Sequence, residues 1–224
     1  RGREDHYAWG QANSRMARKP KQSSTKLPYA SRNFDVVAMG ASAGGLNALI
    51  QVLRVLPASF PSSIVVVQHL APMHKSWIAD LLGRSTPLTV KQAEHGEILL
   101  PATIYTAPPD EHLLVGPGKI QLAHTQLVHF SRPSIDLLFE SVAGTYGSRS
   151  IGVVLSGSGK DGAEGMRTIK ESGGTTIVQM PETAEFRPMP EAAIQTGCAD
   201  FVLRLEKIGE KLSELCCGQT SRNG

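Results

Sequence analysis

Ser42 stands in the middle of Gly40-Ala41-Ser42-Ala43-Gly44, which matches the G-x-S-x-G arrangement of a serine on a sharp turn. An apolar run at 34–39 precedes the motif and leucines at helical spacing follow it over 46–56, so the turn should join a strand to a helix. Such a turn exposes the hydroxyl, and the free N–H groups of the helix can stabilise a developing oxyanion. A phosphate-binding turn is the alternative, but a dinucleotide site prefers glycine at position 42 and a P-loop needs Gly-Lys-Ser/Thr. The motif therefore favours a nucleophilic serine.

A serine hydroxyl becomes a good nucleophile only beside an imidazole, which a carboxylate usually orients. Among the seven histidines, only His69 lies at the expected C-terminal end of a strand, 64–68. Asp161 lies in a second glycine-rich stretch, directly after the apolar run 151–155. Because parallel strands end at one edge of their sheet, we expect Ser42, His69 and Asp161 to converge there as a catalytic triad. Asp161 could equally be the N-cap of the helix that follows it.

The other six histidines predict no chemistry. His6 lies in the N-terminal segment, and the rest lie in turns or beside short strands, where surface or capping roles are usual: His74, His95, His112, His124 and His129. Asp110-Glu111-His112 looks like a catalytic cluster, but adjacent residues of an extended loop do not converge on one point. We therefore interpret all six as structural.

The elements that must position the triad alternate between β-branched runs and amphipathic stretches, which is typical of an α/β domain. The expected strands are 34–39, 64–68, 151–156, 175–179 and 201–203, and the expected helices are 46–56, 77–82, 134–139, 163–172, 190–196 and 208–215. Short strands at 104–106, 113–115 and 120–122 surround the turn signal at 116–119, which predicts an antiparallel hairpin. The predicted fold is a doubly wound, mostly parallel sheet flanked by helices, with an antiparallel hairpin insertion.

Length and composition suit one catalytic domain, since the chain has 224 residues and is 41% hydrophobic. No apolar run approaches the roughly 18 residues of a membrane helix, so we expect no membrane insertion. The three cysteines, Cys198, Cys216 and Cys217, form neither a disulfide framework nor a Cys/His metal motif, which favours the reducing cytoplasm. We expect no metal and no cofactor.

Positive charge is concentrated at the N-terminus. Residues 1–33 carry eight Lys or Arg against Glu4 and Asp5, a net +6, while the whole chain has +3, so the remainder is acidic at −3. We expect no nucleic-acid partner, although residues 1–33 could alternatively be a basic arm for nucleic acid or a membrane. The predicted organisation is a disordered basic extension or linker at 1–33, a catalytic domain at 34–216 and a disordered tail at 217–224.

Five motifs follow one another along the chain: Gly40-Ala41-Ser42-Ala43-Gly44-Gly45, Gln68-His69, Arg132-Pro133-Ser134-Ile135-Asp136, Gly157-Ser158-Gly159-Lys160-Asp161-Gly162-Ala163 and Met189-Pro190-Glu191-Ala192-Ala193-Ile194. In these motifs and their order, from about residue 34 to residue 205, the chain resembles the protein-glutamate methylesterases of bacterial chemotaxis, the CheB family. The resemblance implies hydrolysis of glutamyl methyl esters on the cytoplasmic helices of chemoreceptors, with release of methanol, and in some members deamidation of glutamines. It also implies that Ser42 is the nucleophile, His69 the base and Asp161 its orienting acid. The chain order Ser, His, Asp differs from the order Ser, Asp, His of α/β-hydrolases, which counts against that alternative.

We expect oxyanion and substrate contacts from Ala43, Ser158, Arg132 and Met189. Ala43 stands where many members have Thr, whose hydroxyl would support the histidine. Ser158 stands where many have Met, whose backbone N–H would serve the oxyanion hole, and a backbone donor survives substitution. Arg132 could orient an acidic receptor segment or could simply be a helix-entry residue. Arg187-Pro188 replaces a more usual glycine, so the loop beside the substrate should differ in shape.

Two other functions remain open. A non-catalytic receptor-docking module could have kept the fold and lost turnover, and an esterase for small diffusible esters would share the triad and differ in its pocket. The receiver domain usual in this family has no counterpart in the 33 residues that precede the domain, so we expect the chain not to inhibit itself. The sequence indicates no particular oligomeric state.

Overall fold

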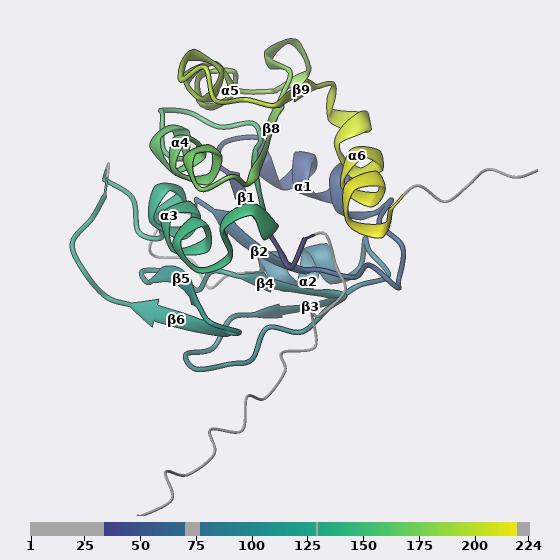
Figure 1. The fold of residues 1–224 in the computed structure, drawn as a ribbon, viewed down its shortest axis with the longest axis vertical. Coiled ribbons are helices and arrows are strands. Elements are labelled where there is room, and N and C mark those ends of the chain that lie inside the picture. The colour runs from purple at the N-terminus through teal and green to yellow at the C-terminus, as the bar shows by residue number, and fades with distance from the viewer. Residues whose placement is uncertain (1–33, 70–76, 129, 219–224) are drawn as a thin grey trace, which may run out of the picture.

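A large parallel sheet forms the centre of the computed structural model, which describes residues 34–69, 77–128 and 130–218 (Figure 1). Its strand order is β3-β4-β2-β1-β7-β8-β9, and every neighbouring pair is parallel. The strands are β1 (Val36–Ala41), β2 (Ser63–Gln68), β3 (Thr89–Gln92), β4 (Thr103–Thr106), β7 (Ser150–Val154), β8 (Thr175–Gln179) and β9 (Phe201–Leu203). The predicted α/β class and mostly parallel sheet are confirmed.

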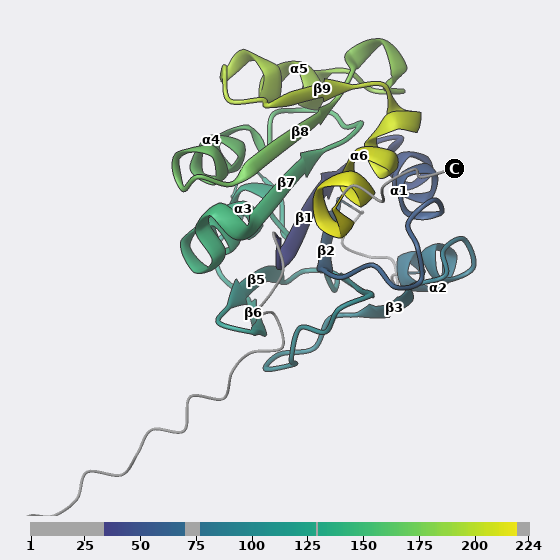
Figure 2. The same cartoon turned by 45° about the vertical axis from the view of Figure 1, so that its right-hand side comes forward.

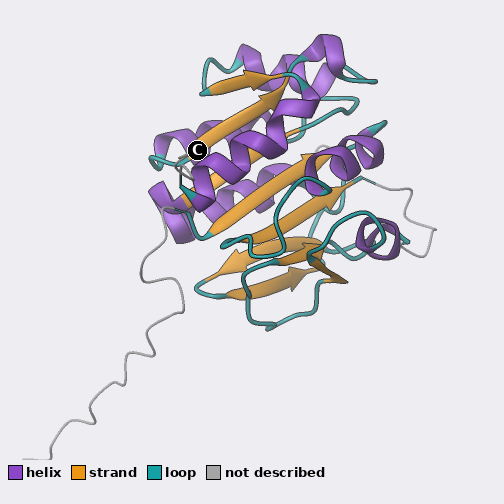
Figure 3. Cartoon of the chain, turned by 90° about the vertical axis from the view of Figure 1, so that its right-hand side faces the viewer, coloured by secondary structure: helices purple, strands orange, loops and turns teal. Residues whose placement is uncertain are grey.

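Helices cover both faces of this sheet (Figures 2 and 3). One face carries α1 (Gly45–Leu53), α2 (Ile78–Gly83) and α6 (Leu205–Cys217). The other carries α3 (Ile135–Tyr146), α4 (Ala163–Glu171) and α5 (Pro188–Gln195). Two short 3-10 turns, Gly147–Arg149 and Pro181–Thr183, complete the regular structure.

Alternate residues of the central strands belong to two separate cores. In β1, Val37 and Met39 pack with the core on the α1 face, while Val36 and Ala38 pack with the core on the α3 face. Every residue of β1 and β2 is buried, as expected for parallel strands with helices on both sides. This double burial explains why these strands appear in the sequence as continuous apolar runs.

A separate two-stranded antiparallel sheet packs over the α3 face. It consists of β5 (His112–Gly116) and β6 (Lys119–Ala123), so the predicted hairpin is confirmed. Its Leu113, Val115 and Ile120 side chains join the core under α3. Strand β4, which we expected beside the hairpin, instead pairs with β2 and β3 in the large sheet.

The sequence analysis did not predict β3, and it placed the end of α1 three residues too late. All four residues of β3 are exposed or half-buried, so this edge strand has no apolar run for a sequence pattern to detect. Helix α1 ends at Leu53 rather than residue 56, because the chain turns there and brings Leu56 and Phe60 into the core. Helix α3 continues to Tyr146, seven residues beyond the expected end at 139, and the other predicted elements differ less at their ends.

The order of the strands places the functional edge of the sheet. Strand β1 lies between β2 and β7. The chain first forms β2, β3 and β4 on one side of β1 in the sheet, and later forms β7, β8 and β9 on its other side. Ligand sites of open α/β sheets lie at such a reversal, outside the carboxyl ends of the strands. In the described ranges, no helix is both long and apolar enough to cross a membrane. The expected extension at 1–33 and residues 219–224 of the expected tail at 217–224 lie outside the described residues, while α6 continues to Cys217. The proposed domain boundaries remain predictions.

Candidate active site

Ser42 lies on a three-residue turn between β1 and α1. Its N–H donates to Ser156 O at 3.0 Å, and its carbonyl accepts from Gly45 N at 2.9 Å, so the backbone of the turn is held on both sides. Gly44 has φ of 69°, and a Cβ there would come within 2.7 Å of the Glu185 Cβ. Only glycine fits this position, which explains the second glycine of the motif.

The side chain of Gln68 fixes Ser42 and His69 relative to each other. Its Nε2 donates to the carbonyl oxygens of Ser42 at 2.6 Å and of His69 at 3.1 Å. The His69 N–H also donates to Ala41 O at 3.0 Å, beside the nucleophile turn. The sequence analysis gave Gln68 no role of its own, because its bond to Ser42 crosses from one strand end to the next.

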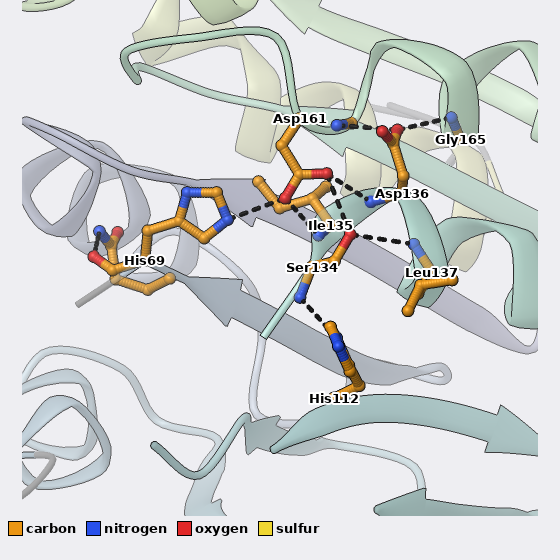
Figure 4. A network of polar contacts seen from close by, with 10 residues as sticks. His69, His112, Ser134, Ile135, Asp136, Leu137, Asp161 and Gly165 are labelled. Atoms are coloured by element: carbon orange, nitrogen blue, oxygen red, sulfur yellow. Dashed lines mark hydrogen bonds and ion pairs between the residues drawn. The ribbon is translucent and has the colours of Figure 1, made fainter. Parts of the chain in front are cut away.

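Asp161 is joined to His69 and to the first turn of α3 (Figure 4). Its Oδ2 lies 2.9 Å from His69 Nε2 and accepts from Ile135 N at 2.8 Å. Its Oδ1 accepts from Ser134 Oγ at 3.1 Å and from Asp136 N at 2.9 Å. A buried carboxylate, 4% exposed, therefore has four donors, three of which come from consecutive residues at a helix N-terminus.

Burial acts to raise the pKa of Asp161, but the hydrogen bonds from His69, Ile135 and Asp136 outweigh it and lower the pKa below the ordinary value. The carboxylate is thus ionised at neutral pH and can only accept. His69 must then donate from Nε2, which leaves its Nδ1 as the nitrogen able to take a proton. This is the reverse of the nitrogen usage in chymotrypsin, where the aspartate binds Nδ1.

A cavity of about 480 Å³ opens at this edge of the sheet. Its described lining includes Ser42, His69 and Asp161, so the structure brings the three predicted residues to one cavity. Within the described part of the chain, no hydrogen bond joins Ser42 Oγ to the His69 ring. Contacts of this kind often tighten only when a substrate is bound.

Two backbone donors lie beside the nucleophile. Ser158, on the loop after β7, lines the cavity, and Ala43 follows Ser42 in the turn. Among the residues the structure describes, neither N–H has a hydrogen-bond partner. The N–H after the nucleophile is the usual first donor of an oxyanion hole, and both groups are available for that purpose.

Arg132 and Met189, which we expected to touch substrate, are not among the described lining residues of the cavity. Arg132 donates from Nε and Nη2 to Asp110 Oδ1, at 2.9 and 2.6 Å, and from Nη1 to Thr125 O at 2.5 Å. Met189 is 1% exposed and packs against Gly157, where an added Cβ would lie 2.0 Å from its sulfur. Both residues therefore shape the walls around the cavity, and neither is part of its described lining.

Asp136 is a site residue to which the sequence analysis gave no function. Its Oδ1 accepts from Gly162 N at 2.9 Å and Gly165 N at 2.8 Å, at the start of α4. Burial, with the nearby Asp161 charge, raises its pKa to about 6. Asp136 of α3 thus caps α4, while Asp161, just before α4, caps α3.

Phe130 is an unexpected feature of the cavity mouth. It is 96% exposed, has φ of 62° and lines the same cavity as Ser42. Ser131 beside it exchanges two backbone hydrogen bonds with Val128, at 2.8 and 3.1 Å, which closes a tight turn. No sequence signal separates such a residue from a buried phenylalanine.

The comparisons with known proteins all match members of one family. The family model for the CheB methylesterase matches residues 37–212. A protein of Leptospira interrogans is 41% identical over 179 residues, which cover 80% of this chain and 93% of that protein. The Thermotoga maritima CheB methylesterase catalytic domain, a crystal structure, is 40% identical with a TM-score of 0.78 and covers 81% of this chain and 98% of that one.

Two further relatives are longer than this chain. Protein-glutamate methylesterase/protein-glutamine glutaminase 2 of Anaeromyxobacter dehalogenans is 42% identical, and the match covers 84% of this chain and 55% of that protein. Protein-glutamate methylesterase FrzG of Myxococcus xanthus is 40% identical, with 81% of this chain and 54% of that protein covered. The chain therefore spans about half the length of these two relatives. The chain belongs to the CheB methylesterase family.

Proposed function

We propose that this chain is a cytoplasmic protein-glutamate methylesterase, which hydrolyses glutamyl methyl esters on the cytoplasmic helices of chemoreceptors and releases methanol. The observation that carries the proposal is the 2.9 Å contact between His69 and Asp161 at a cavity that Ser42 also lines. The family membership and the names of the relatives support the choice of substrate.

In the proposed reaction, Ser42 Oγ attacks the ester carbonyl carbon and its proton passes to His69 Nδ1. The negative charge that develops on the carbonyl oxygen is stabilised by the N–H groups of Ala43 and Ser158. Collapse of this intermediate breaks the bond to the methoxy group, which leaves as methanol with the proton from His69. Water then attacks the acyl-serine with His69 as base, which releases the glutamate carboxylate and restores Ser42.

Glutamine deamidation is the second activity that the site supports. The same acyl-serine forms when the leaving group is ammonia rather than methanol, and His69 protonates it in the same way. The name of the Anaeromyxobacter dehalogenans relative includes a glutaminase activity. The two reactions share every proposed residue and differ only in the group that leaves.

The first prediction concerns Ser42→Ala, assayed beside the wild type for methanol release from methylated receptor membranes. Because removal of a triad nucleophile elsewhere costs a comparable amount, we expect the rate to fall about 10⁴-fold or more. A melting curve of both proteins checks that the variant is folded. Methanol release by both proteins at similar rates would remove Ser42 from the mechanism.

The same comparison separates the other functions. A receptor-docking module would bind receptor membranes without releasing methanol and without labelling of Ser42 by a fluorophosphonate. An esterase for small esters would cleave a short acyl ester and leave the methylated receptor unchanged. Either pattern of results would contradict the proposed methylesterase activity and support the corresponding alternative function.

A further inference from the structure

His112 is a buried histidine whose two ring nitrogens are both occupied. It lies in β5 with 0% exposure. Its Nδ1 accepts from the Ser134 N–H at 3.1 Å (Figure 4). Its Nε2 lies 2.9 Å from Gln126 O. Because an N–H can only donate and a carbonyl can only accept, the ring is neutral and carries its hydrogen on Nε2.

The contact with Ser134 lies directly behind the triad carboxylate. Ser134 is the N-cap of α3, and its hydroxyl, with the N–H groups of Ile135 and Asp136, supplies three of the four hydrogen bonds to Asp161. The Ser134 N–H points away from Asp161 and binds His112. His112 therefore anchors the start of the three-residue stretch that holds the carboxylate.

The contact with Gln126 connects His112 to the wall of the cavity. Gln126 lies in the segment from β6 to α3, which also contains the cavity-lining residues Phe130 and Ser131. Arg132 holds the same segment through Thr125 O. One imidazole thus joins this wall, the small sheet and the helix end that binds Asp161.

We propose that His112 is a positioning residue for the hydrolytic reaction, which keeps the first turn of α3 in the place where it orients Asp161 and, through Asp161, His69. The proposal rests on the proposed function, since it concerns the same site. The competing interpretation is a core histidine that contributes only to folding stability. The two interpretations differ in whether loss of the Nδ1 contact with Ser134 slows the reaction by more than the loss of folding stability explains.

Three substitutions separate the two nitrogens. In His112→Asn, the amide oxygen takes the place of Nδ1 and can accept from Ser134, but the side chain does not reach Gln126. In His112→Gln, the amide nitrogen takes the place of Nε2 and can donate to Gln126, but Ser134 loses its acceptor. His112→Phe removes both contacts. His95→Phe is the control, because His95 is exposed and its hydrogen bonds within the described residues are to the backbone of Leu122.

The experiment measures kcat and KM for methanol release, the rate at which a fluorophosphonate modifies Ser42, and the low-field proton resonance of His69 Nε2–H. A displacement of about 1 Å in a catalytic group can lower a rate about a hundredfold, so we expect His112→Gln and His112→Phe to lower kcat about ten- to a hundredfold. KM should change little, and the resonance should shift or broaden. We expect His112→Asn to retain most of the rate and the resonance, and His95→Phe to match the wild type.

The proposal is overturned if His112→Asn is as slow as His112→Phe, or if the rates of the variants follow their melting temperatures alone. If the wild type releases no methanol, the result concerns the proposed methylesterase activity and not the role of His112. If it still reacts with the fluorophosphonate and the variants keep the expected order, the methylesterase proposal fails and the role of His112 stands.

Discussion

Asp161 takes its position from neighbours that are distant in the sequence. The N-cap and the first two residues of α3, together with His69, donate to its two oxygens, and each oxygen accepts two bonds. All four of these partners are donors, so an amide NH₂ in place of either oxygen would find no acceptor among them. Its low pKa also implies that the stability it contributes is present above its unfolded pKa and is lost as the pH falls through the lower folded value.

Asp161→Asn is therefore expected to disturb the site although the side chain keeps its size. The amide NH₂ must face at least two donors, so hydrogen bonds to His69 or to α3 are lost. By comparison with the same change in a serine protease, we expect kcat for methanol release to fall about 10⁴-fold. Parallel melting curves separate misfolding from misorientation, and a folded variant within about tenfold of the wild-type rate would contradict the assigned role.

At the scale of the elements, α3 and α4 cap each other. Asp136 in the first turn of α3 accepts from Gly162 and Gly165, while Asp161 before α4 accepts from α3. The helices approach closely at Gly165, where a Cβ would lie 2.6 Å from the Phe139 Cβ. Each carboxylate lies at the positive end of a helix dipole, and together they join the two helices beside the cavity.

Asp136→Asn tests this arrangement through the pH dependence of stability. Between the ordinary aspartate pKa of 3.8 and the folded pKa of about 6, the unfolded chain has lost the Asp136 proton while the folded protein keeps it. The folded state then binds more protons, so this group lowers the unfolding free energy as the pH rises. Asparagine keeps the acceptor oxygen without this titration.

We expect Asp136→Asn to become more stable relative to the wild type as the pH rises from about 4 to above 6. The difference in unfolding free energy should grow by at most roughly 3 kcal/mol and then stay constant. Urea unfolding of both proteins across this range measures the difference. A difference that does not change with pH would show that Asp136 is ionised in the folded protein throughout.

At the scale of the whole molecule, the last helix closes one face of the sheet. Helix α6 packs on α1, and the backbones approach closely at Gly209, where a Cβ would lie 2.6 Å from Val52 O and 2.3 Å from Val55 Cγ2. Ile208 and Leu212 are buried in the same core as the central strands. The C-terminal end of the chain thus covers strands formed near its beginning.

Gly209→Ala and Gly144→Ala form a matched pair that tests this packing. Both glycines lie in helices, but nothing lies within 4 Å of a Cβ at Gly144 in α3. Alanine at 144 should raise the unfolding free energy by about 0.5–1 kcal/mol through helix propensity. At 209 the backbone clash should outweigh this gain and lower the unfolding free energy by about 1–3 kcal/mol. Denaturant unfolding of both variants measures the pair, and an equal gain at both positions would contradict the close α1–α6 contact.

Features that depend on neighbouring residues could be predicted from the amino-acid sequence. Continuous apolar runs predicted the buried strands, and the glycine-rich turns after β1 and β7 predicted where functional groups would stand. Ser42 and His69 directly follow strands, and Asp161 lies in the glycine-rich loop after β7, so their common edge followed from the parallel class alone. The edge strand β3 escaped because its residues are at most half-buried and carry no apolar pattern.

The residues that hold these groups in place could be identified only in the folded molecule. Three donors to Asp161 lie 25 to 27 residues away at the start of α3, and the fourth is His69. The contacts of Arg132 turn it toward Asp110 and Thr125, and His112 reaches Ser134 from another sheet. Such hydrogen bonds depend on strand order and on where each helix begins in space. A local pattern carries neither, because the same residues at the same spacing would meet different partners if the strands were ordered differently.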